Sequence, residues 1–155
     1  MRFMDPYAPF IARLFLVALF PFSALDKIVH WNAALEQANS SFLPGGPILL
    51  AFGAAIEIIT PICILLRIFD RGAAFVLAGF CIVTAVLYHN FWAYPGGFFV
   101  AGDGGPALSH LWDFLKNFGL AGGLFYVVAD AKPRPLSEFL DHPFRVPTSG
   151  KDTAA

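Results

Sequence analysis

Ionisable side chains stand in all four long apolar stretches of this 155-residue sequence, and we first consider Arg13, Glu57, His89 and Lys116. Near the centre of a bilayer an Arg, a Lys or an acid costs about 2.5–3.5 kcal/mol, so such residues turn toward one another or toward a wet cavity. A rise of about 1.5 Å per helical residue predicts depths of about 5, 10, 15 and 20 Å below the outer face, in the order His89, Lys116, Glu57, Arg13. We therefore expect a polar path that opens at the outer face of the membrane.

The fourth apolar stretch carries further polar residues on the helical face of Lys116. His110, Asp113 and Asn117 follow at steps of three and four residues, and such spacings share one face of a helix. The residues that we single out for ligand binding or proton relay are Arg13, Glu57, His89, His110, Asp113, Lys116 and Asn117. No catalytic residue is assigned, because the sequence offers no candidate triad.

Two interpretations of these residues stay open. In the first, Glu57 neutralises Arg13 or Lys116 and holds the helices in register, through a bond typically worth about 0.6 kcal/mol. In the second, the residues bind a ligand or carry a proton. The inward charges sum to +1, which leaves Asp113 or an anionic ligand to balance them. Pro61 also removes the helical partner of the Glu57 carbonyl, which predicts a polar hollow and a kink.

Metal and cofactor chemistry is less well supported by the sequence. His89, His110, Glu57 and Asp113 could supply metal ligands, but no His-x-x-x-His or Glu-x-x-His pair lies on any stretch. No flavin, haem or iron–sulfur motif is visible, and the two cysteines form no C-x-x-C pair. We therefore predict no metal site and no cofactor held by the chain itself.

The composition indicates which elements position these residues. Hydrophobic residues make up 57% of the sequence and charged residues 14%, with a mean hydropathy of +0.66 and a net charge of −1. These values exclude a mostly disordered chain, and the lack of a basic stripe argues against a nucleic-acid partner. The apolar stretches have about the 20 residues that a helix needs to cross a bilayer, and they cover residues 9–25, 47–66, 72–92 and 107–129. We predict an all-α membrane protein, a bundle of four transmembrane helices.

The distribution of Lys and Arg predicts the orientation of this bundle. Lys27 lies on one side of the predicted spans, whereas the other side carries Arg2, Arg67, Arg71, Lys132, Arg134, Arg145 and Lys151. Both termini are therefore expected in the cytoplasm. Residues 1–130 form the predicted transmembrane domain, and residues 131–155 form a polar, proline-rich cytoplasmic tail.

The link between the first two spans, residues 26–46, is predicted to contain a short amphipathic helix in the outer interface. Ile28, Trp31, Leu35 and Ala38 recur there at helical spacing, opposite polar side chains. A Pro-Gly-Gly sequence then ends this helix.

Other residues predict how the spans pack and bend. Gly119 and Gly123 have the small-x-x-x-small spacing of close helix contacts, as do Ala74 and Ala78. Pro21 lacks the N–H that a continuous helix needs, which predicts a kink in the first span.

Several short motifs follow one another along the chain. They are Arg13, Ser23-Ala24-Leu25-Asp26-Lys27-Ile28, Glu57, Arg71-Gly72-Ala73-Ala74, His89-Asn90-Phe91-Trp92 and Phe114-Leu115-Lys116-Asn117-Phe118-Gly119-Leu120-Ala121-Gly122-Gly123-Leu124. This series resembles the DoxX family of small four-helix bacterial membrane proteins, over about residues 8–130. The Lys-Asn pair with the following Gly-Gly is the most specific part, whereas Ser23-Ala24 departs from the Ser-Gly usual in the family.

The resemblance implies a subunit of the bacterial inner membrane that is linked to an oxidoreductase system and holds a quinone-like or other small ligand. It implies a site formed by Arg13, Glu57, His89, Lys116 and Asn117, with electrons supplied by a partner protein. The expected partners are thus the lipid bilayer and either another protein of a membrane complex or further copies of the chain. Two alternatives stay open: a non-catalytic membrane anchor or assembly factor, and a small-molecule transporter that works as an oligomer.

Overall fold

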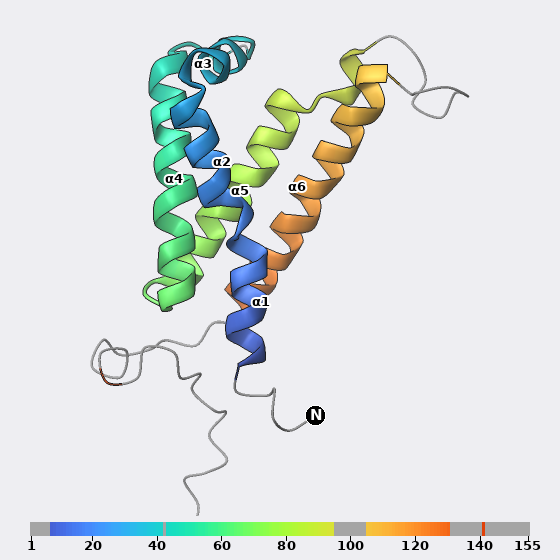
Figure 1. Ribbon diagram of the computed structural model, residues 1–155. Coiled ribbons are helices and arrows are strands. Elements are labelled where there is room, and N and C mark those ends of the chain that lie inside the picture. Colours follow the sequence, from blue (N-terminus) through green and yellow to red (C-terminus); the bar gives the residue numbers. More distant parts are fainter. Residues whose placement is uncertain (1–6, 42, 95–104, 131–140, 142–155) are drawn as a thin grey trace, which may run out of the picture.

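Every regular element is a helix in the residues that the computed structural model describes, which are 7–41, 43–94, 105–130 and 141. The elements are α1 (Ala8–Val17), α2 (Leu19–Val29), α3 (Trp31–Asn39), α4 (Gly46–Leu66), α5 (Asp70–Tyr88), the 3-10 helix η1 (Phe91–Ala93) and α6 (Gly105–Asp130). In Figure 1, α1 continues into α2 and forms a bundle with α4, α5 and α6, and α3 lies at the end of α2 and α4. The predicted all-α class is confirmed, whereas the predicted tail lies almost entirely outside the described residues.

The N-terminal helical segment of the bundle, Ala8–Val29, is interrupted at Ala18, between α1 and α2. The N–H of Ala18 still donates to the carbonyl of Leu14 over 2.9 Å. Pro21, three residues later, has no N–H and cannot donate to the carbonyl of Val17. One backbone hydrogen bond of a continuous helix is therefore missing at this point, as predicted. The segment nevertheless continues as helix to Val29, four residues beyond the predicted end of the first span at residue 25.

Three stretches of the described chain are long and apolar enough to cross a bilayer: Ala8–Val29, Gly46–Leu66 and Asp70–Ala93. Large apolar side chains point away from the bundle, and Phe15 and Phe22 are 76% and 72% exposed. A soluble monomer rarely exposes such a surface, so the chain is a membrane protein. The fourth predicted span coincides with α6, which is long enough but carries a polar face; that it crosses the membrane stays a prediction.

The part of the bundle around α1 and the C-terminal half of α6 is densely packed. Val17, Ile64, Leu77 and Leu124 are almost fully buried and belong to one hydrophobic core. The predicted small-residue face of α5 also lies in this core, because Ala74 and Ala78 are fully buried. This packing leaves the opposite part of the bundle to accommodate polar groups.

The helix predicted in the link after the first span is shorter than expected. α2 runs to Val29, so Ile28 belongs to α2, and α3 begins only at Trp31. α3 packs against α4 and buries Ala38, while most of its polar side chains are exposed. An amphipathic helix is therefore present at α3, and its place in the membrane interface stays a prediction.

Only one glycine of the predicted Gly119-x-x-x-Gly123 contact meets a neighbouring helix. A Cβ atom at Gly123 would lie 2.8 Å from Cδ1 of Leu16 in α1, whereas a Cβ at Gly119 would have no heavy atom within 4 Å. A side chain at position 123 would therefore displace the Leu16 side chain, which packs against Gly123 between α1 and α6.

Gly123→Val should lower the free energy of unfolding by about 1–3 kcal/mol, the usual cost of adding atoms to a packed site. Gly119→Val is the matched control, because the same change on an open face of the same helix should cost less than about 0.5 kcal/mol. Thermal unfolding in detergent micelles measures both. Equal loss of stability in the two variants would contradict a specific contact at Gly123.

Candidate functional site

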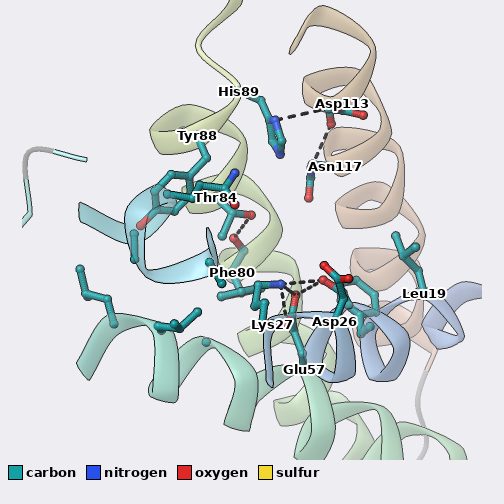
Figure 2. Close-up of a pocket in the computed structure, with 18 of the residues that line it drawn as sticks. Leu19, Asp26, Lys27, Glu57, Phe80, Thr84, Tyr88, His89, Asp113 and Asn117 are labelled. Atoms are coloured by element: carbon teal, nitrogen blue, oxygen red, sulfur yellow. Dashed lines mark hydrogen bonds and ion pairs between the residues drawn. The ribbon is translucent and has the colours of Figure 1, made fainter. Parts of the chain in front are cut away.

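A pocket of about 550 Å³ lies in the part of the bundle away from the packed core. Residues of α2, α3, α4, α5 and α6 line it. Figure 2 shows that Lys27 and Glu57 lie on one side of this pocket, with His89, Asp113 and Asn117 on the other. The pocket thus separates two polar groups that come from different helices.

The first polar group joins α2 to α4. Nζ of Lys27 lies 2.9 Å from Oε1 and 2.9 Å from Oε2 of Glu57, and 2.6 Å from Oγ of Ser23. Ser23 in turn donates to Oε1 of Glu57 over 3.0 Å. Ser23 and Lys27 are four residues apart, so one helical face of α2 presents both to the same carboxylate.

We call this group closed, because every N–H donor of Lys27 has an acceptor within the group. A Lys ammonium has three N–H donors, and Lys27 has three acceptor atoms within hydrogen-bond distance. The Glu57 side chain is only 5% exposed and accepts from both Ser23 and Lys27. A buried carboxylate without such partners would be costly, so the group fixes α2 against α4.

The second polar group is centred on Asp113 of α6. Nζ of Lys116 lies 3.0 Å from Oδ1 of Asp113. Nδ2 of Asn117 donates to the backbone carbonyl of Asp113 over 2.9 Å. Nδ1 of His89, just after α5, is 4.0 Å from Oδ2 of Asp113, which is too long for a hydrogen bond. His89 thus connects the end of α5 to this group by charge alone, when its ring is protonated.

This second group is open, since its contacts with other described residues leave capacity unused. Lys116 keeps two of its three N–H donors. The side-chain amide of Asn117 keeps one N–H donor and its carbonyl oxygen. Nδ1 of His89 is buried and has no hydrogen-bond partner within the described ranges. A small polar molecule in the pocket would find its hydrogen bonds on this side.

Arg13 does not line the pocket and belongs to a separate pair. Its Nη2 lies 3.5 Å from Oδ2 of Asp70 at the start of α5, and both side chains are less than 10% exposed. Asp70 also accepts from the N–H of Arg71 over 2.9 Å, as an acid in the first turn of a helix can. The expected polar path from His89 down to Arg13 is therefore divided, and Arg13 serves the packed half of the bundle.

His110 lies beside the open group but does not line the pocket. Its ring stacks on Tyr94 with 4.5 Å between centroids, and it lies 5.8 Å from the ring of His89. The structure thus brings Glu57, His89, Asp113, Lys116 and Asn117 to one pocket and leaves Arg13 and His110 outside it. What these residues do in function stays a prediction.

Sequence reasoning missed Ser23, Lys27 and Asp70, which complete the ion pairs. Lys27 was assigned to the outer link because the first span was ended at residue 25. The signal that could have identified it is the Ser23/Lys27 spacing on one helical face. Asp70 begins α5 and pairs with Arg13, and an acid in the first turn of a helix that follows a buried Arg in a neighbouring span could have been considered as its partner.

The pairing removes the charge excess expected from the sequence. Lys27 balances Glu57, and Asp113 balances Lys116, so Asp113 supplies the charge that an anionic ligand would otherwise bring. In the described part of the chain, no group of three or more His, Cys, Asp or Glu side chains could hold a metal ion. Asp26 also lines the pocket, and its Oδ1 lies 2.9 Å from Nδ1 of His30. The carboxylates of the lining thus each have a partner, which suits an uncharged ligand with hydrogen-bonding atoms.

Comparison with known proteins gives a family and a relative. The DoxX family matches residues 8–90 of this chain. The chain is also 26% identical over 133 residues to the inner membrane protein YphA of Escherichia coli strain K12, which covers 85% of this chain and 88% of the relative. No solved structure gives a significant match.

Lys27→Met should lower the free energy of unfolding by about 3 kcal/mol, the lower end of the range for a broken buried pair. The lower end is expected because the Lys27 side chain keeps 25% of its surface exposed. The double variant Lys27→Met/Glu57→Gln should recover most of the loss, since no buried charge is then left alone. Unfolding in detergent micelles measures the cycle.

Lys116→Met is the control for this cycle, because its side chain is 69% exposed and its ion pair should contribute less than about 1 kcal/mol. A double variant that is no more stable than Lys27→Met would show that Lys27 does not neutralise Glu57.

Proposed function

The chain belongs to the DoxX family, and from this premise we propose that it is a subunit of an oxidoreductase system that binds a quinone-like ligand in the pocket between α2 and α6. Its apolar helices and its inner-membrane relative support a multi-pass protein of a bacterial inner membrane. The proposal goes beyond these findings by naming a ligand and a role.

The observation that carries the proposal is a pocket whose carboxylates have partners and whose wall on α6 keeps unused hydrogen-bonding groups. Its volume of about 550 Å³ lies within the usual range of about 300–1,000 Å³ for small-molecule sites. The closed wall at Lys27 and Glu57 is fixed by its own ion pair. The open wall at Lys116 and Asn117 offers donors to a carbonyl oxygen.

A quinone carbonyl matches the open wall chemically. A quinone is uncharged, so it can enter without disturbing the paired charges, and each of its carbonyl oxygens accepts hydrogen bonds. When electrons arrive, negative charge develops on these oxygens, and the cationic Lys116 with His89 would stabilise it. Electrons would come from a partner protein, and Glu57 would hold Lys27 in place at the opposite wall.

A cytoplasmic location of both termini completes the proposal. Lys27 lies within α2 as the partner of Glu57, so it is not one of the Lys and Arg residues outside the spans. The seven Lys and Arg residues on the other side therefore determine the orientation. With this orientation the pocket lies in the outer half of the membrane.

A membrane anchor or assembly factor is the second candidate, favoured by the two ion pairs that join separate helices. Lys27–Glu57 ties α2 to α4, and Arg13–Asp70 ties α1 to α5. In this function the charges fix helix packing, and residues from Pro133 onward would hold a partner protein. A small-molecule transporter remains a third candidate, without an observation that favours it.

The quinone proposal can be tested with 2,3-dimethoxy-5,6-dimethyl-1,4-benzoquinone, whose fully substituted ring cannot add to the two cysteines. Quenching of the fluorescence of the three tryptophans, with the protein in lipid nanodiscs, measures binding. Lys116→Met should weaken binding about tenfold or more, because a hydrogen bond from a charged donor contributes about 1.5–3 kcal/mol.

Leu115→Met is the matched control, since it changes the neighbouring exposed residue of α6 outside the pocket and should leave binding unchanged. If the wild type does not bind the quinone, or if both variants bind as the wild type does, the site is not a quinone site. An anchor function is then tested by deleting residues from Pro133 onward and measuring release of partner proteins.

The orientation is tested by reporter fusions. Green fluorescent protein fused to the C-terminus should fluoresce, because it folds in the cytoplasm, and alkaline phosphatase fused after Ser41 should be active, because it needs the periplasm. The reverse pattern would contradict the proposed orientation.

A further inference from the structure

An apolar groove of about 290 Å³ lies between α4 and α5, next to the polar pocket. Its lining is apolar except for Thr84 and Tyr88. The hydroxyl of Thr84 is directed back at its own helix, 2.9 Å from the carbonyl of Phe80 and 3.1 Å from that of Cys81. The groove therefore offers little to a polar group and suits a hydrocarbon chain.

The groove is open toward the surface of the bundle that faces lipid. Phe52 of α4 and Val76 and Val83 of α5 line it, and they are 66%, 48% and 53% exposed. These helices are two of the three apolar spans. A chain lying in the groove would thus pass directly into the acyl region of the bilayer.

The groove and the polar pocket share a wall. Leu49, Gly53, Phe80, Thr84 and Tyr88 line both cavities. At the crossing of α4 and α5, a Cβ atom at Gly53 would lie 3.4 Å from Cε2 of Phe80, so the Phe80 ring packs directly against the α4 backbone. Phe80, labelled in Figure 2, is thus the part of the shared wall that lies against Gly53, and a change of its side-chain rotamer would open this wall.

We propose that the ligand is an amphiphile with a quinone-like head and a hydrocarbon chain. The head occupies the polar pocket against Lys116 and Asn117, and the chain passes between Gly53 and Phe80 into the groove and out to the lipid. This inference rests on the proposed function, because the head must bind in the polar pocket. It adds the class of ligand and the route by which it enters from the membrane.

The groove determines where the chain lies, and it adds little to affinity. Lipid tails are as apolar as the groove, so a chain gains almost no hydrophobic free energy by moving from one to the other. A comparison of affinities would therefore miss the groove. The informative measurement is the position of the chain when the head is bound.

The test uses a 2,3-dimethoxy-5-methyl-1,4-benzoquinone that carries a diazirine within a 6-alkyl chain. The probe is photolysed with the full-length protein in lipid nanodiscs, and the labelled residues are identified by mass spectrometry. We expect labelling at Phe52, Val76 and Val83. An excess of the chain-free tetrasubstituted quinone should suppress it, because both molecules compete for the same head site.

Val83→Trp should fill the groove and abolish this labelling. Val86→Trp is the matched control on the same helix, because Val86 is 46% exposed and lines neither cavity. It should leave the labelling intact. Neither variant should change binding of the chain-free quinone, since neither residue lines the polar pocket.

Labelling spread over lipid-facing residues such as Phe15 and Phe22, without competition, would overturn the route through the groove. Labelling confined to α3 would overturn it as well, since the chain would then leave by another side of the pocket. In both cases, retained binding of the chain-free quinone would leave the proposed function standing. Loss of that binding in the wild type would remove the proposed function and this inference together.

Discussion

The pairing of Glu57 with Lys27 is the constraint on which the pocket depends. A carboxylate that is almost fully buried within an apolar span is costly unless it is neutralised, and here a cation on the facing helix α2 does this. Ser23 donates a hydrogen bond to the carboxylate and accepts one from the ammonium, so the ion pair is held on α2 by a second side chain. The pair determines how α2 faces α4, and it leaves no N–H donor of Lys27 free for a ligand.

Two modes of packing divide the bundle along its length. Around Ala74, Ala78 and Gly123, small residues let α1, α5 and α6 approach closely, and the remaining space is filled by large aliphatic side chains. Toward the other end, polar residues replace these side chains, and the helices enclose a cavity. The Arg13–Asp70 pair belongs to the first region and the Lys27–Glu57 pair to the second. The pocket thus lies in the second region only, whereas both regions hold an ion pair that joins two helices.

The helical class and the location of three spans could be predicted because the thickness of a bilayer and the hydropathy of the chain act locally along the sequence. The partners of the buried charges could not, because they depend on the rotation of each helix about its axis. Glu57 was matched with Arg13 or Lys116, yet Lys27 is its partner. The error began at the end of the first span, where Asp26 and Lys27 were read as a link, although α2 carries them to the pocket. The shared face of Asp113, Lys116 and Asn117 could be predicted, since their spacing lies within one helix, and all three line the pocket, although the Lys116 side chain is mostly exposed.

Neutral pairing also limits the kind of molecule that this pocket can select. An ion would meet charges that already have partners, so its own desolvation would not be repaid. An uncharged molecule with carbonyl oxygens loses less on leaving water and gains the donors of α6 that remain unused. Because the same pocket shares the Gly53–Phe80 wall with an apolar groove, such a molecule can carry a chain without exposing it to the polar wall. The paired charges of the pocket therefore favour an uncharged head group, and the adjoining groove favours a hydrocarbon chain. A single amphiphilic ligand has both parts.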